Sequence, residues 1–235
     1  MPLNRSKGQM FKSVGWTWTV CRGCSHACAS CWAAAMARRR GEDFGKPILV
    51  EKDLGIRFPG DGSWIFVCSS GDLFSPAVPD QWIYFILDKI NRDGYGNRFL
   101  LQTKNPARIL RFTNHLVDPR CYIVGTTIET NRDTSAWSEA PSTARRQDVM
   151  VQLRRLGFET FLSLEPLADF DCTILGSWIV EVNPSCIEMG LENYTHLLPA
   201  PPIEKVQLLY DALRGQRFNV LLKDNLVGKI KEAKP

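Results

Sequence analysis

The chain has 235 residues, of which 44% are hydrophobic and 23% charged, and its formal net charge is +4. This length is enough to bury one sizeable core, so we expect a single domain over residues 1–235, without internal repeats or low-complexity tracts. The segment Met1–Lys7 lacks the apolar core of a secretory signal, and the densest apolar run, Trp82–Leu87, is too short to span a bilayer. We therefore expect a soluble, cytoplasmic protein with no membrane partner.

Short β-rich runs alternate with helical stretches along most of the chain. The predicted strands, in chain order, are Trp16–Val20, Trp64–Ser69, Arg98–Gln102, Tyr122–Thr127, Thr160–Leu164, Trp178–Val182 and Asn219–Leu222. The predicted helices are Trp32–Arg40, Pro79–Arg92, Pro106–His115, Ser142–Leu156 and Pro202–Arg214. Several strands are near-continuous apolar runs, which is typical of parallel strands that are buried on both faces.

This alternation predicts a parallel sheet, either open and doubly wound or curled into a barrel. No Gly-x-Gly-x-x-Gly turn follows the first strand, which disfavours a dinucleotide-binding fold, and a cysteine-rich loop over residues 21–32 stands there instead. We therefore expect an α/β fold, a partial (β/α)6-type TIM-like barrel with parallel strands, in which the C-terminal segment 202–235 closes the barrel. The segments Gly41–Ser63 and Asn183–Pro201 are predicted to be loops.

The basic residues are somewhat grouped along the chain. The groups are Arg5, Lys7 and Lys12, then Arg38–Arg40, then Arg145, Arg146, Arg154 and Arg155 on a predicted helix. Such groups fit a polyanion partner such as nucleic acid, but a solvated helix face is the commoner explanation.

Four of the eight cysteines lie within eleven residues, which favours metal ligands over disulfides in a reducing compartment. Cys24, Cys28 and Cys31 are separated by three and then two residues. An iron–sulfur cubane normally has four thiolate ligands, so three from one tight loop leave one iron free to bind another molecule.

Polar residues follow the predicted strands where each apolar run stops. These endings are Ser69–Asp72, Thr103–Lys104, Thr126–Glu129, Ser163–Pro166, Glu181–Asn183 and Lys223–Asp224. In a barrel they converge on one mouth, where barrel active sites lie. A converging ring of charges suits a polar, zwitterionic cofactor.

Six segments occur in a characteristic order: Asn4–Gly8, the cysteine-rich loop, Gly71–Phe74, Thr103–Pro106, Gly125–Glu129 and Ser163–Leu167. Together they resemble a family of short, phage-associated radical S-adenosylmethionine (SAM) proteins. The resemblance covers Asn4–Asn225 and implies a partial (β/α) barrel with one [4Fe–4S] cluster and SAM as cofactors. It also implies a one-electron reductant of flavodoxin or ferredoxin type as a partner, and a phage-encoded protein that acts in the host cytoplasm.

The resemblance assigns site residues by position. Cys24, Cys28 and Cys31 become the iron ligands. Ser69, Ser70, Gly71 and Asp72 stand where radical SAM enzymes usually have a Gly-Gly-Glu-like segment that contacts the methionine amino group, and the shorter Asp72 is a departure from that pattern. The remaining expected cofactor contacts are Thr127 and Glu129 to the ribose hydroxyls, Lys104 to the methionine carboxylate and Trp32 beside the adenine.

The chemistry implied by the resemblance is reductive cleavage of SAM to a 5′-deoxyadenosyl radical that abstracts hydrogen from a substrate. We expect a modified DNA base or nucleotide as substrate, in an isomerase, mutase or lyase-like reaction, with an amino-acid or peptide substrate fitting nearly as well. Glu165, Lys223 and Glu181 are the expected substrate contacts. Cys186, in a predicted loop, is a candidate hydrogen donor, although a loop thiol with no role is the commoner case.

Two alternatives remain. Cys21 and Cys24 with Cys28 and Cys31 form two Cys-x-x-Cys pairs, which would suit a zinc-stabilised nucleic-acid-binding module without catalysis, but the spacer between the pairs is short for zinc. A cluster protein that has lost SAM cleavage is the other. His26 is a possible ligand but is expected to support the site or lie at the surface. Cys68, Cys121 and Cys172 are expected in the core.

Overall fold

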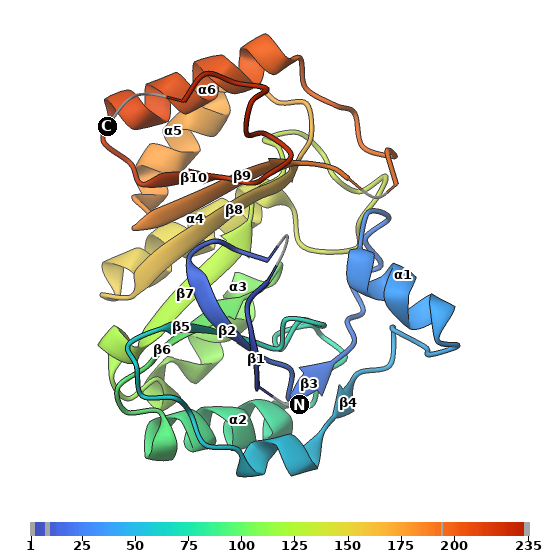
Figure 1. Cartoon of the computed structure of the whole chain (residues 1–235), viewed down its shortest axis with the longest axis vertical. Coiled ribbons are helices and arrows are strands. Elements are labelled where there is room, and N and C mark those ends of the chain that lie inside the picture. Colours follow the sequence, from blue (N-terminus) through green and yellow to red (C-terminus); the bar gives the residue numbers. More distant parts are fainter. Residues whose placement is uncertain (1–2, 8–9, 194, 233–235) are drawn as a thin grey trace.

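Eight strands form one curled sheet in the computed structural model, which describes residues 3–7, 10–193 and 195–232 (Figure 1). The order is β1-β2-β5-β6-β7-β8-β9-β10, and every neighbouring pair is parallel except β1 with β2. The strands are β1 (Leu3–Arg5), β2 (Val14–Trp18), β5 (Trp64–Val67), β6 (Arg98–Gln102), β7 (Tyr122–Thr127), β8 (Glu159–Leu167), β9 (Cys186–Leu191) and β10 (Val220–Leu222). This half-barrel confirms the predicted fold class.

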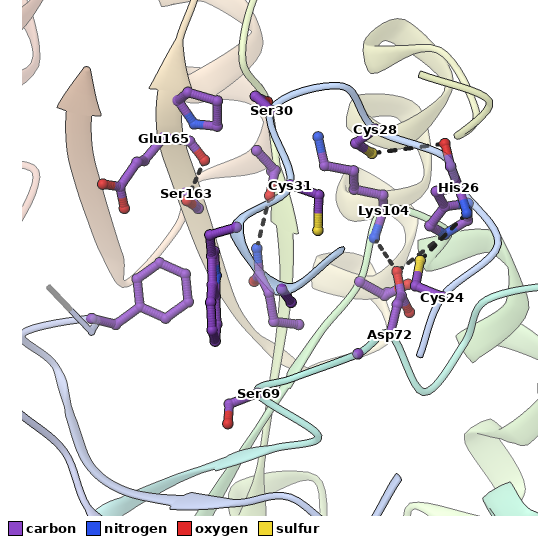
Figure 2. A pocket seen from close by; sticks show the side chains of 18 of the residues that line it. Cys24, His26, Cys28, Ser30, Cys31, Ser69, Asp72, Lys104, Ser163 and Glu165 are labelled. Carbon is purple, nitrogen blue, oxygen red and sulfur yellow. Dashed lines mark hydrogen bonds and ion pairs between the residues drawn. The ribbon is translucent and has the colours of Figure 1, made fainter. Parts of the chain in front are cut away.

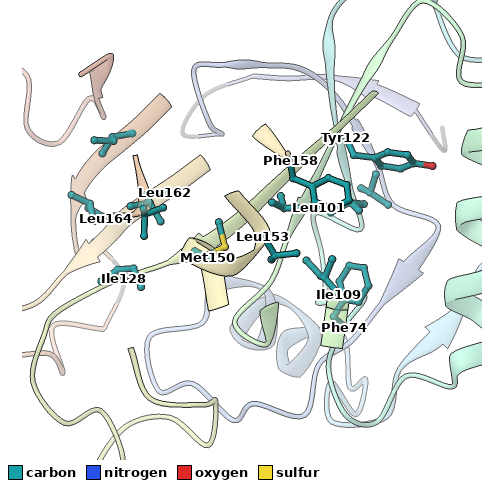
Figure 3. Close-up of a cluster of buried hydrophobic side chains, with 14 of the residues drawn as sticks. Phe74, Leu101, Ile109, Tyr122, Ile128, Met150, Leu153, Phe158, Leu162 and Leu164 are labelled. Carbon is teal, nitrogen blue, oxygen red and sulfur yellow. The ribbon is translucent and has the colours of Figure 1, made fainter. Parts of the chain in front are cut away.

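Helices cover the outer face of the sheet (Figure 1). They are α2 (Asp80–Asp93), α3 (Pro106–Ile109) with the 3-10 helix η2 (Leu110–His115), α4 (Thr143–Arg155), α5 (Cys172–Val182) and α6 (Ile203–Gly215). Met150 and Leu153 of α4 pack in one apolar cluster with Leu101 of β6 and Leu162 of β8 (Figure 3). No helix among the described residues is long and apolar enough to cross a membrane.

A second apolar cluster fills the inner, concave side of the sheet. Its members come from six strands: Val14, Phe66, Leu100, Ile123, Phe161 and Cys186. Strand residues two apart face the same side of a sheet. The residue two positions after each of these cluster members therefore also faces inward. The ring of Phe11 packs against those of Phe66 and Phe161, with centroid distances of 5.4 and 5.0 Å. Phe11 of the N-terminal segment therefore fills part of the concave side of the half-barrel.

A smaller group of elements lies beside the main sheet. It comprises β3 (Cys21–Arg22), β4 (Ile48–Leu49), α1 (Trp32–Arg39) and the 3-10 helix η1 (Glu51–Gly55). A further 3-10 helix, η3 (Pro119–Cys121), is not part of this group and directly precedes β7. Helix α1 stands apart from the other helices (Figure 1). Gly8 of the predicted N-terminal motif and residues 233–235 of the predicted closing segment lie outside the described residues.

One predicted strand is wrong. Trp178–Val182 forms the last part of α5, because Leu175, Ile179 and Val182 are buried at helical spacing while Glu181 is exposed. Asn183 ends the helix in the left-handed conformation, with φ at 48°.

The strand that takes this place in the sheet is β9, which lies within the predicted loop Asn183–Pro201. Its sequence is Cys-Ile-Glu-Met-Gly-Leu, and the buried Glu188 interrupts what would otherwise be a plain apolar run. The other predicted strands and all five predicted helices are confirmed to within a few residues, although Pro106–His115 changes from α to 3-10 geometry partway along.

Candidate active site

A cavity of about 400 Å³ lies at the carboxyl ends of the parallel strands (Figure 2). Its walls include segments that follow β5, β6 and β10, the ends of β7, β8 and β9, and the cysteine-rich loop. Figure 2 shows Cys24, His26 and Asp72 on one side, Glu165 and Ser163 on the other, and Cys31 and Lys104 between them. We call these sides the cysteine end and the far end.

Cys24, Cys28 and Cys31 all line the cavity as half-buried free thiols. Local backbone geometry directs hydrogen bonds at two of the sulfurs. The Cys24 Sγ accepts from the His26 N–H at 3.4 Å, and the Cys31 Sγ caps α1 by accepting from the Ala34 N–H at 3.4 Å. Donors of this kind and a helix N-terminus stabilise a thiolate.

Burial outweighs these donors, because it raises the pKa of both the Cys24 and the Cys31 thiol. Burial therefore disfavours the thiolate form of Cys24 and Cys31 unless a positively charged group binds them. Thiolates bound to a metal or a cluster are deprotonated outright, and their charge is then balanced. The donor set thus fits a thiolate-ligated cluster chemically.

Two glycines hold the cysteine-rich loop against the end of β5. The Gly23 N–H donates to Ser70 O, and the Asp72 N–H donates to Gly23 O, each at 3.2 Å. A Cβ on Gly71 would lie 2.6 Å from Gly23 O and 2.9 Å from Gly23 N. Only glycine permits this approach.

Gly71→Ala is therefore expected to push the cysteine-rich loop away from β5. We expect a loss of about 1–3 kcal/mol in the free energy of unfolding, as for other overpacked sites, measured by urea denaturation. Gly55→Ala is the matched control, because no atom lies within 4 Å of its Cβ position. Equal stability of the two variants would contradict the tight approach.

Asp72 is a buried anchor between the loop and the sheet. Its carboxylate bonds the His26 ring at 3.1 Å and accepts from the backbone N–H groups of Phe74 and Lys104, each at 2.9 Å. Burial alone would raise the pKa of Asp72, but the hydrogen bonds, from His26 above all, lower it overall. The carboxylate that the resemblance assigns to the methionine ammonium is thus already engaged by three protein partners.

The same region offers a second grouping of possible metal ligands. The Cys24 sulfur, a His26 ring nitrogen and an Asp72 carboxylate oxygen lie within 4.8 Å of one another. His26 is buried, which corrects the expectation of a surface position. Its ring supports the loop through Asp72, as expected of a residue behind the ligands.

Lys104 belongs to a buried charge cluster with Glu129 and Arg146, which we call the cationic triad. Lys104 lines the cavity and its Nζ bonds Glu129, whose other oxygen lies 2.8 Å from the Arg146 Nη1. Arg146 is fully buried and also donates to the backbone carbonyls of Thr127 and Pro141. Burial would raise the pKa of Glu129, but the two cations hold it at about 2. The triad carries one net positive charge.

Glu129 therefore lies behind the cavity wall, where its carboxylate is occupied by two cations. The residues of the cofactor assignment that do line the cavity are Trp32, Ser69, Gly71, Asp72, Lys104 and Thr127. Ser70 and Glu129 are not among the lining residues.

A second charge cluster, the far-end triad, consists of Glu165, Lys223 and Glu188. The Lys223 Nζ lies 3.2 Å from the Glu165 carboxylate and 3.8 Å from that of Glu188. Glu188 is fully buried and accepts from the Lys12 N–H, the Ser13 N–H and the Ser13 hydroxyl at 2.7–2.9 Å. Glu165 and Lys223 line the cavity, so these two predicted residues do meet at one place.

Cys186 does not lie in a loop at the mouth. It is buried at the start of β9, in the inner apolar cluster beside Phe161, and burial raises the pKa of its thiol to about 12. Glu181 lies on α5, on the outer side of the sheet, where it accepts from Gln147. The structure therefore separates both from the cavity.

Cys21 is fully buried, does not line the cavity, and its thiol contacts that of Cys68. Its side chain thus lies apart from the other three thiols of the loop. The arrangement does not favour a zinc site that requires all four cysteines.

Several cavity residues carry no sequence signal of function. Met10 and Phe11 come from the N-terminal segment, and Glu192 and Asn193 follow the unpredicted strand β9. Two apolar residues such as Met10 and Phe11 are common just before a strand, so no sequence pattern could have identified Phe11 as a cavity residue.

The same half-barrel occurs in solved structures of radical SAM enzymes. A spore photoproduct lyase complexed with dinucleoside spore photoproduct has a TM-score of 0.52 at 13% identity, over 77% of this chain and 57% of that chain. A radical SAM methyltransferase from Sphaerobacter thermophilus has a TM-score of 0.55 at 12% identity, over 91% and 67%. A methylornithine synthase has a TM-score of 0.51 at 11% identity, over 93% and 77%. At these identities the likeness shows the fold.

The chain belongs to the family described as protein of unknown function (DUF5131), whose model matches residues 11–181. The chain spans 57% of the length of the spore photoproduct lyase named above. No curated protein matches its sequence. Neither the family nor the similar structures support the phage association that the sequence resemblance implies.

Proposed function

We propose that this protein is a radical SAM enzyme in which Cys24, Cys28 and Cys31 hold a [4Fe–4S] cluster and the cavity beside them binds SAM. The observation that carries this proposal is the convergence of three free thiols, from one loop, on a cavity at the carboxyl ends of a parallel half-barrel. The solved structures that share this fold are radical SAM enzymes, which supports the same reading.

The protein's own groups would bind and orient the cofactor. Lys104 presents the net positive charge of the cationic triad to the cavity, which suits the methionine carboxylate of SAM. Thr127 and Ser69 offer hydroxyls at the wall, and Trp32 offers an aromatic face beside the third cysteine. The engaged carboxylate of Asp72 instead holds the loop in place, so the ammonium contact would fall to neighbouring carbonyl or hydroxyl oxygens.

When bound, the reduced cluster and SAM would supply a primary alkyl radical that removes a hydrogen atom from the substrate. The chain would limit side reactions by excluding water. Phe11 and the inner apolar cluster, which includes Phe66, close the cavity on the side that faces the interior of the half-barrel. A one-electron reductant of flavodoxin or ferredoxin type would provide the electron.

We propose a modified DNA base or nucleotide as the substrate class, transformed by an isomerase-type or lyase-type reaction. The support is the size of the cavity together with the fold shared with a lyase whose structure contains a dinucleoside. The alternative, an amino-acid or peptide substrate, is supported by the fold shared with a methylornithine synthase.

Anaerobic reconstitution with iron and sulfide tests this proposal. We expect a brown protein with about four irons per chain and an absorption band near roughly 400 nm. After reduction with SAM, we expect 5′-deoxyadenosine, measured by mass spectrometry. Transfer of deuterium from one labelled candidate among DNA, nucleotides and amino acids would identify the substrate class.

A colourless protein that binds one zinc would overturn the proposal. A brown protein that binds SAM without cleaving it would instead favour the cluster protein without catalysis. One non-clustered metal ion held by Cys24, His26 and Asp72 would also contradict the cluster assignment, because it would contain no sulfide.

A further inference from the structure

We propose that the far end of the cavity binds a positively charged amino group of the substrate at the Glu165 carboxylate. This assignment rests on the proposed function, because it takes the cysteine end as the place of SAM. It narrows the substrate class to molecules that carry an ammonium group away from the reacting carbon.

The charges at the far end do not balance. The far-end triad contains two carboxylates and one ammonium, so it carries one net negative charge when all three groups are ionised. Glu188 is fully buried and Lys223 nearly so, which removes most of the water that would screen them. An uncompensated charge in such a place is costly unless a partner of opposite charge is supplied.

Among the residues that the structure describes, the other cations near the far end are already paired. At the rim, the Lys12 ammonium is 3.1 Å from Asp224, so this pair is neutral. Glu192 also lines the cavity, where its carboxylate accepts N–H bonds from Thr195 and Leu197 in its own loop. Lys104 also lines the cavity, but it lies between the two ends and is bound to Glu129.

Two outcomes can neutralise the far end: Glu165 takes up a proton, or a cation binds. Glu165 is the member of the triad that can respond, because it is the more exposed carboxylate, while Glu188 is fixed by three donors from Lys12 and Ser13. Burial raises the pKa of Glu165, and Glu188 adds to this while Lys223 opposes it. A bound ammonium would replace the proton and restore the ionised carboxylate.

The shape of the site supports a built position for the Glu165 carboxylate. A Cβ on Gly190 of β9 would lie 2.9 Å from Glu165 Oε1 and 2.8 Å from Lys223 Cγ. Because Gly190 has no side chain, the side chains of Glu165 and Lys223 both fit against the cavity wall at this point. The Phe11 ring is part of the same wall and already faces the Lys223 Nζ, which lies 4.8 Å from the ring centroid.

The two charge clusters of the cavity therefore have opposite character. The cationic triad, whose Lys104 lies between the two ends, carries one net positive charge, and the far-end triad carries one net negative charge. A carboxylate suits the first and an ammonium suits the second. Because SAM would occupy the first with its methionine part, the ammonium at the second belongs to the substrate.

The test uses two nucleosides that differ in one group, 5-aminomethyl-2′-deoxyuridine and 5-hydroxymethyl-2′-deoxyuridine. The dissociation constants for the full chain are measured by calorimetry at neutral pH, where the amine is protonated. We expect the amine to bind at least about tenfold more tightly than the alcohol. In Glu165→Gln, which keeps the shape and removes the charge, this preference should disappear.

Glu181→Gln is the matched control, because it makes the same chemical change on the outer side of the sheet. It should keep the preference for the amine, and thermal unfolding should show that both variants are folded. Equal binding of the two nucleosides, a preference that survives Glu165→Gln, or no binding of the amine up to about 10 mM would each overturn the assignment. Failure of the proposed function is seen separately, as the absence of iron and of 5′-deoxyadenosine.

Discussion

Replacement of Cys28 by alanine is expected to reduce the iron bound after reconstitution to less than about a tenth of the wild-type content. Cys24→Ala and Cys31→Ala should behave in the same way. Cys21→Ala, by contrast, should keep nearly all of its iron and its ability to cleave SAM. The measurements are iron and sulfide content per chain, the visible absorption spectrum and the yield of 5′-deoxyadenosine.

The difference between these variants follows from where the thiols lie. Cys24, Cys28 and Cys31 line the cavity, whereas Cys21 is buried in β3 with its thiol against that of Cys68. Removing one of three ligands leaves a cluster with two open iron sites, which is not held by the remaining thiolates. Removing Cys21 takes away a small apolar contact, at a cost in stability of about 1 kcal/mol.

Two results would contradict this assignment. Loss of the metal from Cys21→Ala, in a protein that still unfolds cooperatively, would make all four cysteines ligands and return zinc to consideration. Retention of the full iron content by Cys28→Ala would mean that a residue outside the cysteine-rich loop supplies a ligand. His26 would then be the first to examine, because its ring lies close to the Cys24 sulfur.

The cysteine site could be predicted from the sequence because its parts are local. Three ligands within eight residues are brought together by one loop, whatever the rest of the chain does. The half-barrel could also be predicted from the sequence, because parallel strands buried on both faces are apolar runs that are easily recognised between amphipathic helices. Tyr122–Thr127, for example, is buried at every position.

The far end of the cavity could not be predicted in the same way, because it depends on pairing between distant segments. Glu188 is a charged residue inside a buried strand, which breaks the apolar pattern of β9, and its partners are 175 residues or more away at Ser13 and Lys12. Trp178–Val182 was predicted to be the sixth strand, so Cys186 was predicted to lie in the loop after it. Cys186 is buried because it is instead the first residue of β9, the strand that was not predicted.

The position of Glu129 was missed for a related reason. A carboxylate just after a strand suggests a residue that faces the mouth, as Glu165 does. Glu129 instead turns behind the wall, because Arg146 of α4 reaches under the end of β7 and pairs with it. Only the packing of that helix against the sheet reveals an ion pair with both members at most 1% exposed.

This buried pair gives the largest expected effect on stability. Arg146 holds Glu129 and two backbone carbonyls, those of Thr127 and Pro141. In Arg146→Met these acceptors lose their donor, and Glu129 keeps only Lys104 as a cation. Removing one partner of a buried ion pair costs about 3–5 kcal/mol, so we expect a loss of about that size in the free energy of unfolding, measured by urea denaturation at neutral pH.

Arg145→Met is the matched control, because the neighbouring Arg145 is exposed and its replacement should change stability by less than about 0.5 kcal/mol. The pH dependence gives a second readout. The pKa of Glu129 is about 2 in the folded protein against an ordinary 4.5, so its contribution is present above pH 4.5 and is lost as the pH falls toward 2. In Arg146→Met this pKa should rise, and the fall in stability between those pH values should become smaller. An unchanged acid profile would show that Lys104 alone sets the ionisation of Glu129.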